Sequence, residues 1–464
     1  MSCDVVDAAM GRPVGGSEYT WCRAVPGGTG IAVLAFLLSK PPLLSRLQTA
    51  LHKLQNTHPI LNSTLHFNPN ASSFSFLTSP ATPSLVVQSF DLSATSTLLV
   101  SGHDSAVSPF HQILEHHLNH DSWGHLHLSH TNVPVLFASI YELPDETWAV
   151  VLRLHVAACD RTTAASLLRE LLPLTMEEDE GGEGRKKECS ELSMAIEELM
   201  PSGEGKKGVW ARGMDILAYS LNSVRLTNLK FEDTKSRRRS QVVRLQLNKN
   251  ETDRVLAGCR KRGIKLCGAL TAAGLMAAHG GKKSGKKYGV VTLIDCRSNL
   301  HPPLSSRDFG FYHSAILNTH EMEGGEDSLW DVAERAYEAL SNSKKSNKHL
   351  SDMADLNLLM RKAMDNPGLT SSSSLRTSIM SVFEDTVIDN VDDGGGEMQR
   401  EVGLEDFVGC ASVHGVGPSI AMFDTIRNGH LDCVSVYPSP LHSRQQMQQF
   451  VASMKAILIH GGQL

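Results

Sequence analysis

A histidine and an aspartate stand five positions apart near the middle of the chain, in the stretch WAVVLRLHVAACDRTTAASLLRELL, residues 148–172. His155 closes an apolar run, and Asp160 lies in the short turn that follows it. An imidazole that is neutral near pH 7 can take a proton from a hydroxyl or an amine, which makes His155 a candidate general base. An interior carboxylate needs a partner, so we expect Asp160 to be paired and to hold the turn in place.

The residues on either side predict a strand, a turn and a helix. The run 148–156 is rich in Val and Leu, which suits a strand that is buried on both faces. After the turn, apolar residues recur with the spacing of one helical face, and Thr162 or Thr163 can cap that helix. Loops at strand ends often carry reactive groups, because a rigid scaffold fixes them beside a cleft.

This stretch resembles the HHxxxDG signature of the chloramphenicol-acetyltransferase-like superfamily. That group includes condensation domains of peptide synthetases, alcohol acetyltransferases and plant acyl-CoA-dependent acyltransferases. In the family the second His is the general base, which deprotonates an acceptor for attack on a thioester, and the Asp is structural. His155 falls on the first His, Val156 on the second, Asp160 on the Asp and Arg161 on the Gly. The resemblance thus implies acyl transfer, yet this chain has a valine at the base position.

Two interpretations of the motif remain open. Successive strand residues point to opposite faces, so if Val156 has the catalytic direction, His155 points away and is a core residue that donates to a strand carbonyl. A bulge in residues 157–159 would instead re-aim His155 and keep it as the base. The direction of His155 therefore separates an acyltransferase from a catalytically degenerate protein that binds a thioester, a metabolite or a protein partner without turnover.

Two later segments extend the resemblance. The phrase Asp295-Cys296-Arg297 resembles the DxR strand of plant acyltransferases, whose Arg pairs with the motif Asp. This implies that Arg297 is the structural partner of Asp160, with Arg23 and Arg161 as competitors. The segment RDFGFYHS (307–314) aligns with a strand that borders the inter-domain channel in the family. The alignment implies channel positions for Tyr312 and for His313. His313 is a substitute base if His155 does not act as the general base.

Two further groups of polar residues are weaker candidates. Ser412 and His414 stand where the family places small polar residues that line the channel, and the absence of a GxSxG elbow argues against a serine hydrolase. Four histidines gather in one predicted helix, at His111, His116, His117 and His120. There is no HExxH order and the segment is largely polar, so we expect an exposed helix and no metal site.

The chain is long enough for two domains, since 464 residues exceed what one hydrophobic core usually serves. Residues 47–67 and 247–278 look like the openings of the two halves of a condensation-type domain. The resemblance implies an α/β fold (α+β layered) with two chloramphenicol-acetyltransferase-like halves, each a mixed sheet flanked by helices, and a channel between them. We place the halves at 1–175 and 241–464, joined by a flexible charged linker with helices at 176–240. The basic triplet 237–239 in this linker attracts a CoA phosphate, acts as a nuclear signal or is an exposed connector.

Bulk properties exclude several classes of protein. The chain is 41% hydrophobic and 20% charged with a net charge of −6, which gives no reason to expect nucleic-acid binding. Its nine cysteines include no CxxC pair, which favours reduced thiols over disulfides or zinc. No signal peptide opens the chain, and the early apolar run 31–38 is too short to span a bilayer. We therefore expect a soluble, cytoplasmic protein with no membrane partner.

The shared order of these matches implies the transfer of an acyl group from an acyl-CoA or a carrier thioester to a hydroxyl or an amine. A thioester brings its own leaving group, so the resemblance implies acyl-CoA as a co-substrate and no bound cofactor. The protein need only position two small molecules, the acyl donor and the acceptor, and remove one proton. We expect a monomer, because a channel between two halves of one chain removes the need for an oligomer.

Overall fold

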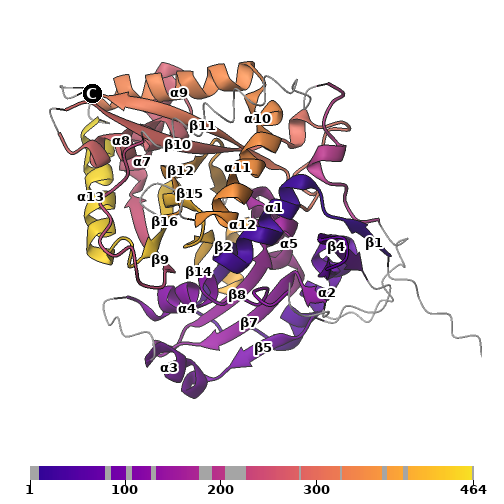
Figure 1. Cartoon of the computed structure of the whole chain (residues 1–464). Helices are drawn as coiled ribbons and strands as arrows, with labels where there is room; N and C mark the ends of the chain where they lie inside the picture. Colours follow the sequence, from indigo (N-terminus) through magenta and orange to yellow (C-terminus); the bar gives the residue numbers. More distant parts are fainter. Residues whose placement is uncertain are drawn as a thin grey trace, which may run out of the picture.

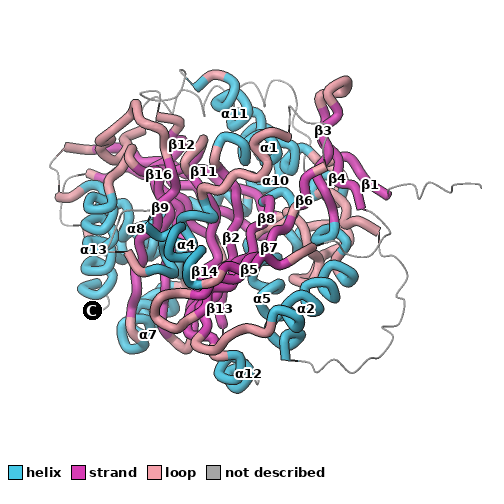
Figure 2. Tube along the Cα trace, turned by 90° about the horizontal axis from the view of Figure 1, so that it is seen from below, coloured by secondary structure: helices cyan, strands magenta, loops and turns pink. Residues whose placement is uncertain are grey.

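The computed structural model describes residues 10–78, 85–100, 107–126, 132–176, 191–203, 226–281, 284–323, 327–367, 374–389 and 395–461. In Figure 1 the N-terminal part of the chain, in indigo to purple, lies below the C-terminal part, in crimson to yellow. Figure 2 shows strands running through the middle of the molecule, with α7, α8 and α13 on one side and α2 and α5 on the other. A cavity lies where the two parts meet.

The first sheet has the strand order β14-β2-β8-β7-β5. Its strands are β2 (Thr29–Leu38), β5 (Val87–Phe90), β7 (Leu136–Glu142), β8 (Trp148–His155) and β14 (Leu404–Val413). β8 lies in the middle, antiparallel to β2 and β7, and is buried from Ala149 onward, as its apolar run predicts. The strand ends one residue earlier than predicted, because Val156 opens a 3-10 turn, η3 (Val156–Ala158).

Three helices cover this sheet: α2 (Leu44–Thr57), α4 (Pro109–Leu118) and α5 (Arg161–Met176). α2 packs against α5, and α4 packs against β2 and β8. Asp160 caps α5, since its Oδ1 accepts a hydrogen bond of 2.8 Å from the backbone N–H of Thr163. The prediction that Thr162 or Thr163 caps the helix is wrong, because the helix begins before either threonine, at Arg161.

α4 is not the exposed helix that its polar composition suggested. Its apolar residues, Phe110, Ile113, Leu114 and Leu118, are all buried, and so is His117, which lies 2.9 Å from the hydroxyl of Tyr141. The prediction failed because these residues share one helical face at positions i, i+3, i+4 and i+8, which polar neighbours on the other face obscure. Within the described ranges no group of three His, Cys, Asp or Glu side chains is arranged to hold a metal ion.

A small second sheet has the order β1-β4-β3-β6 and lies beside the first. Its strands are β1 (Met10–Pro13), β3 (Ser63–Asn68), β4 (Ser73–Thr78) and β6 (Val133–Pro134). α1 (Gly16–Ala24) follows β1 and contacts both the η3 turn and α11 (Met353–Asp365). α1 therefore joins the N-terminal part of the chain to the C-terminal part.

The third sheet has the order β11-β10-β12-β15-β16-β9, with β13 paired to β15. Its strands are β9 (Arg239–Leu247), β10 (Lys286–Asp295), β11 (His313–Met322), β12 (Arg376–Phe383), β13 (Val387–Asp389), β15 (Gly417–Arg427) and β16 (His430–Ser439). Its flanking helices include α7 (Lys249–Arg262), α8 (Leu266–His279), α9 (Leu329–Lys345) and α13 (Arg444–Gly461). α8 packs closely because it is rich in small residues; a Cβ at Gly274 would lie only 2.4 Å from the sulfur of Met380. The remaining helices are α3 (Leu92–Val100), α10 (Lys348–Ser351) and α12 (Gly395–Val402).

Two consecutive strands of the C-terminal part belong to different sheets. β14 pairs with β2 from Leu404↔Leu38 to Val413↔Thr29 and so completes the edge of the first sheet. The next strand, β15, lies between β12 and β16 in the third sheet. The segment that links them, residues 414–416, therefore lies at the junction of the two sheets.

The segment predicted as a linker is described only in part. Helices were predicted within this linker, but residues 191–203 contain only one short 3-10 turn, η4 (Ile196–Glu198). Residues 177–190 and 204–225 of the linker lie outside the described residues. In the portion of the chain that the structure covers, no helix combines the length and the apolar character needed to cross a bilayer.

Candidate active site between the two sheets

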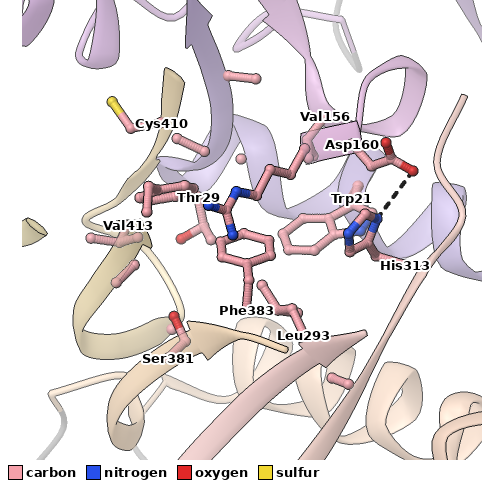
Figure 3. A pocket seen from close by; sticks show the side chains of 18 of the residues that line it. Trp21, Thr29, Val156, Asp160, Leu293, His313, Ser381, Phe383, Cys410 and Val413 are labelled. Carbon is pink, nitrogen blue, oxygen red and sulfur yellow. Dashed lines mark ion pairs between the residues drawn. The ribbon is translucent and has the colours of Figure 1, made fainter. Parts of the chain in front are cut away.

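A cavity of about 610 Å³ lies between the first and third sheets. Its wall includes Trp21, Val156, Asp160, His313 and Phe383, which come from α1, the motif turn, β11 and β12 (Figure 3). Most of the wall is apolar. The N-terminal and the C-terminal parts of the chain both contribute residues to this wall. The motif turn, in the middle of the molecule, therefore faces the third sheet.

Asp160 is buried at the edge of this cavity and has several partners. Its carboxylate lies 2.9 Å from Arg297 Nη1 and accepts hydrogen bonds from the N–H groups of Thr163 and Tyr312, each at 2.8 Å. Its Oδ2 also lies 3.1 Å from Nδ1 of His313. Burial alone raises the pKa of Asp160, but Arg297 and then His313 lower this pKa overall, so the carboxylate is charged at neutral pH.

The structure brings Arg297 to Asp160, as the resemblance to the DxR strand implies. Burial lowers the pKa of Arg297, but Asp160 and Asp295 raise it by more, so the guanidinium stays charged. It also donates to the hydroxyl of Thr163 and the carbonyl of Asp308, and lies over the ring of Tyr312. The two competitors pair elsewhere: Arg23 with Asp365 at 2.7 Å and Arg161 with Asp424 at 3.1 Å.

His313 is the first residue of β11, and its ring lines the cavity. The edge that carries Nδ1 faces Asp160, which leaves the edge that carries Nε2 toward the cavity (Figure 3). The separation of 3.1 Å is short enough for an ion pair, although the Nδ1–H direction is turned away from a full hydrogen bond. Phe311 and Phe383 lie around the ring at centroid distances of 6.5 and 5.9 Å.

His155 lies on the opposite face of β8 and does not line the cavity. Its side chain is 0% exposed, its ring meets Trp123 edge to face at 5.2 Å, and its Nδ1 accepts the N–H of Ala157 at 3.2 Å. Burial lowers the pKa of His155 to about 3. The η3 turn does not re-aim the ring, so the next residue, Val156, has the direction of the cavity.

Val156 packs closely against the backbone of Gly30. Gly30 lies opposite with φ +97°, and a Cβ there would lie 2.6 Å from Cγ1 of Val156 and 3.1 Å from the ring of Trp21. Only glycine combines this backbone conformation with so close an approach. The base position of the family motif is therefore an apolar contact in this protein.

The other predicted channel residues are not gathered at one point. Tyr312 is 1% exposed and donates its hydroxyl to the carbonyl of Met194, so it supports Arg297 away from the cavity. Ser412 lines the cavity, but its hydroxyl accepts the N–H of Ile31 at 3.0 Å. His414 lies outside the cavity wall with Nδ1 3.0 Å from the hydroxyl of Ser240, and burial, followed by Arg376, lowers its pKa to about 4. Ser412 and His414 therefore do not form a nucleophile–base pair.

Three arginines of the cavity wall, Arg161, Arg169 and Arg376, were not predicted as site residues. Arg161, at the position of the family glycine, lies over the ring of Phe383 at 4.2 Å and so connects the motif turn to the third sheet. Arg376, at the start of β12, is 4% exposed. The replacement of glycine by Arg161 was visible in the motif, whereas nothing in the sequence around Arg376 marked it as a cavity residue.

Comparisons with known proteins identify the fold. No family model matches the chain, and no curated protein matches it in sequence. Solved structures do match: the trichothecene 15-O-acetyltransferase from Fusarium sporotrichioides has a TM-score of 0.70 at 11% identity, covering 97% of this chain and 95% of that one. The epimerization domain from the third module of tyrocidine synthetase B has a TM-score of 0.63 at 12% identity, covering 100% of this chain and 98% of that one.

A third match is the polyketide synthase associated protein 5 from Mycobacterium tuberculosis, with a TM-score of 0.63 at 15% identity, covering 97% of this chain and 98% of that one. Each match spans nearly the whole chain. The protein therefore has the two-lobed fold of these structures, with mixed sheets flanked by helices. The fold class predicted from the sequence is confirmed, and these structures share the fold that the family resemblance implies.

Proposed function

We propose that the protein transfers an acyl group from an acyl-CoA or a carrier thioester to a hydroxyl or an amine, with His313 as the general base. One observation carries this proposal: an imidazole that contacts the motif aspartate lines the cavity at the motif turn. Val156 has no proton acceptor, and His155 lies on the far face of β8. His313 is thus the imidazole available at the place where the family reaction needs one.

The surroundings of His313 suit a base. A charged Asp160 favours the tautomer with its proton on Nδ1, which leaves the lone pair of Nε2 to accept the acceptor's proton. The same carboxylate stabilises the imidazolium that forms, in the way that the aspartate of a catalytic triad does. Arg297 keeps Asp160 ionised from the other side. Asp160 is in this proposal a positioning residue and transfers no proton itself.

The cavity supplies the rest of what the reaction requires. Its wall is mostly apolar, so a bound thioester that fills it displaces water, which protects the thioester from hydrolysis and strengthens the electrostatic interaction between His313 and Asp160. In the proposed step the acceptor oxygen or nitrogen bonds to the thioester carbonyl carbon and its proton passes to Nε2. The carbon–sulfur bond then breaks, and the thiolate leaves with a proton returned by His313.

The test is thiol release from a panel of acyl-CoAs with mixed alcohol and amine acceptors, on wild type, His313→Gln and His155→Gln. We expect turnover in wild type that falls by about 10²–10⁴-fold in His313→Gln, the usual contribution of a general base. His155→Gln is the matched control, because it replaces a buried imidazole that does not reach the cavity. Turnover that survives in His313→Gln contradicts the assignment of the base.

A second function is favoured by Val156 itself. With an apolar residue at the family's base position, the cavity would bind a thioester or another apolar ligand without turning it over. This reading expects CoA or acyl-CoA binding by wild type and no thiol release with any acceptor. The two functions differ in that single result.

A further inference from the structure

Arg376 is a buried cation at one end of the cavity, and no carboxylate of the described residues pairs with it. Its guanidinium donates to four backbone carbonyls: those of Ser374 at 3.0 Å, Val413 at 3.0 Å, Pro418 at 2.6 Å and Gly415. Burial, followed by the charge of Arg238, lowers the pKa of Arg376 to about 9. The carbonyls hold the group rigidly but leave its net charge uncompensated, and a buried charge without a counter-ion is costly.

Three more arginines stand beside this buried cation, at the entry to β9. Arg238 donates to the carbonyl of Ser374, the same oxygen that accepts Nε–H of Arg376. Arg237 and Arg239 on either side are exposed, and among the described residues no carboxylate pairs with them. We call Arg237, Arg238, Arg239 and Arg376 the arginine cluster.

The contacts of Ser240 fix the cluster against the cavity. Its hydroxyl accepts the N–H of Val413 at 2.9 Å and lies 3.0 Å from Nδ1 of His414. Val413 lines the cavity, and its carbonyl accepts from Arg376. Arg239, the first residue of β9, and Arg237 just before it lie near the same His414: after burial and Arg376, their charges also lower the pKa of His414.

This end of the cavity is separate from the motif turn. Figure 3 shows Val413 on the side opposite Asp160 and His313, with Thr29, Phe383 and Trp21 between them. The side chain of Thr29 has a buried hydroxyl without a hydrogen-bond partner among the described residues. The cavity thus runs from a cationic end, past a polar atom in need of a partner, to the proposed base.

We propose that the arginine cluster binds a phosphate of a phosphopantetheine thioester, whose arm then extends through the cavity to His313. This inference rests on the proposed function for the identity of the ligand. A guanidinium matches the geometry of a phosphate, and no hydrogen bond to another described residue occupies the N–H donors of Arg237 and Arg239. Arg376 has used four of its five donors, so it acts chiefly by its charge.

The same phosphate chemistry occurs in free CoA and on a carrier protein, and a ligand series separates these sources. Coenzyme A has a 3′-phosphorylated AMP in addition to the 4′-phosphate, 4′-phosphopantetheine has only the latter, and pantetheine has neither. If the cluster binds the 4′-phosphate, CoA and 4′-phosphopantetheine lose affinity together when arginines are removed. If it binds the two phosphates of the adenosine portion, only CoA loses affinity, and free CoA is then the donor.

The experiment is calorimetric titration of the full chain with these three compounds. We compare wild type with Arg237→Gln/Arg239→Gln and with Arg254→Gln/Arg260→Gln, a control that removes two exposed arginines from α7. We expect the Kd for CoA to rise by about tenfold or more in the first variant and to stay unchanged in the control. We also expect the Kd of wild type for CoA to rise with ionic strength. Pantetheine should bind all three proteins with equal affinity.

Equal CoA affinity in wild type and Arg237→Gln/Arg239→Gln overturns this inference and leaves the proposed function standing, as does turnover whose KM for acyl-CoA is the same in both. An absence of CoA binding to wild type also overturns it. CoA binding that depends on the cluster, without thiol release from any acyl-CoA, supports the inference and overturns the proposed catalysis.

Discussion

His155 and His313 are two buried imidazoles beside the same motif turn, and their surroundings differ in every respect that matters for proton transfer. His155 contacts an indole and a backbone N–H on the far face of β8, and no carboxylate of the described residues lies near its ring. His313 contacts the carboxylate of Asp160 and lines the cavity. The first occupies a position of the family motif, and the second comes from a strand 158 residues further along the chain.

In the proposed function, the partner of an imidazole decides its role, more than its place in a motif. Strand alternation directs His155 away from the cavity as soon as Val156 faces it. Arg297 keeps Asp160 charged, and the same carboxylate contacts His313. Any histidine that the fold places beside Asp160 therefore interacts with its negative charge. The motif turn thus contains a carboxylate–arginine pair, while the imidazole in contact with it comes from β11.

The largest expected effect comes from His313→Gln. Glutamine keeps a polar side chain of similar reach but cannot take a proton, so kcat should fall by about 10²–10⁴-fold while KM for both substrates changes little. Steady-state kinetics of thiol release measure both constants. A fall in kcat/KM that comes from KM alone would assign His313 to substrate binding.

Asp160→Asn should weaken both the fold and the chemistry. The substitution leaves Arg297 buried without its main counter-charge, which costs about 3–5 kcal/mol in the free energy of unfolding. It also removes the carboxylate beside His313, so kcat should fall in the fraction that remains folded. Urea unfolding gives the first quantity and kinetics at low temperature the second. A variant as stable as wild type would show that the pair contributes little.

The pH dependence of stability should distinguish His155 from a solvent-exposed imidazole. Its pKa is about 3 in the folded protein and about 6.5 when unfolded, so the unfolded state binds more protons between these values. The contribution of His155 to the free energy of unfolding is complete above pH 6.5. It is lost as the pH falls, by about 2 kcal/mol at pH 5. His111, His120, His320 and His442, each with a pKa lowered to about 4 chiefly by burial, act in the same direction.

Urea midpoints measured from pH 8 to pH 5 check this slope. The control is His155→Gln, which should unfold with a shallower dependence on pH because it removes one of the contributing groups. An identical slope in wild type and variant would mean that His155 is not neutralised by burial.

The smallest expected effect is that of His155→Gln on activity. This variant should lose about 1–3 kcal/mol of stability, since a buried acceptor for the Ala157 N–H is altered, yet its kcat should stay close to that of wild type. Kinetics below the unfolding transition separate the two effects. A loss of activity as large as that of His313→Gln would remove the contrast between the two histidines.

Much of the local architecture was predictable because it depends on neighbouring residues. The apolar run before His155, the helical spacing after Asp160 and the alternation that opposes His155 to Val156 are all local patterns, and the structure contains each of them. The Asp160–Arg297 contact was expected only through the family resemblance. It joins residues 137 positions apart, which no periodicity can connect.

The other features depend on tertiary structure. The contact between Asp160 and His313 requires that β11 begin beside the motif turn, and the hydrogen bond from the Tyr312 N–H to Asp160 fixes that placement. β14 pairs with β2 across most of the sequence, which composition gave no means to foresee. Arg376 is surrounded by carbonyls of a junction that exists only because β14 and β15 enter different sheets.

Chemical rescue tests the central claim most directly, because it asks for an imidazole at one place in the cavity. Thiol release from an acyl-CoA is measured for His313→Ala and His155→Ala, each with and without added imidazole. We expect His313→Ala to be nearly inactive and to recover turnover as imidazole is added, while His155→Ala is active and unaffected by it. A normal rate in His313→Ala, with the loss and the rescue found in His155→Ala, would contradict the account.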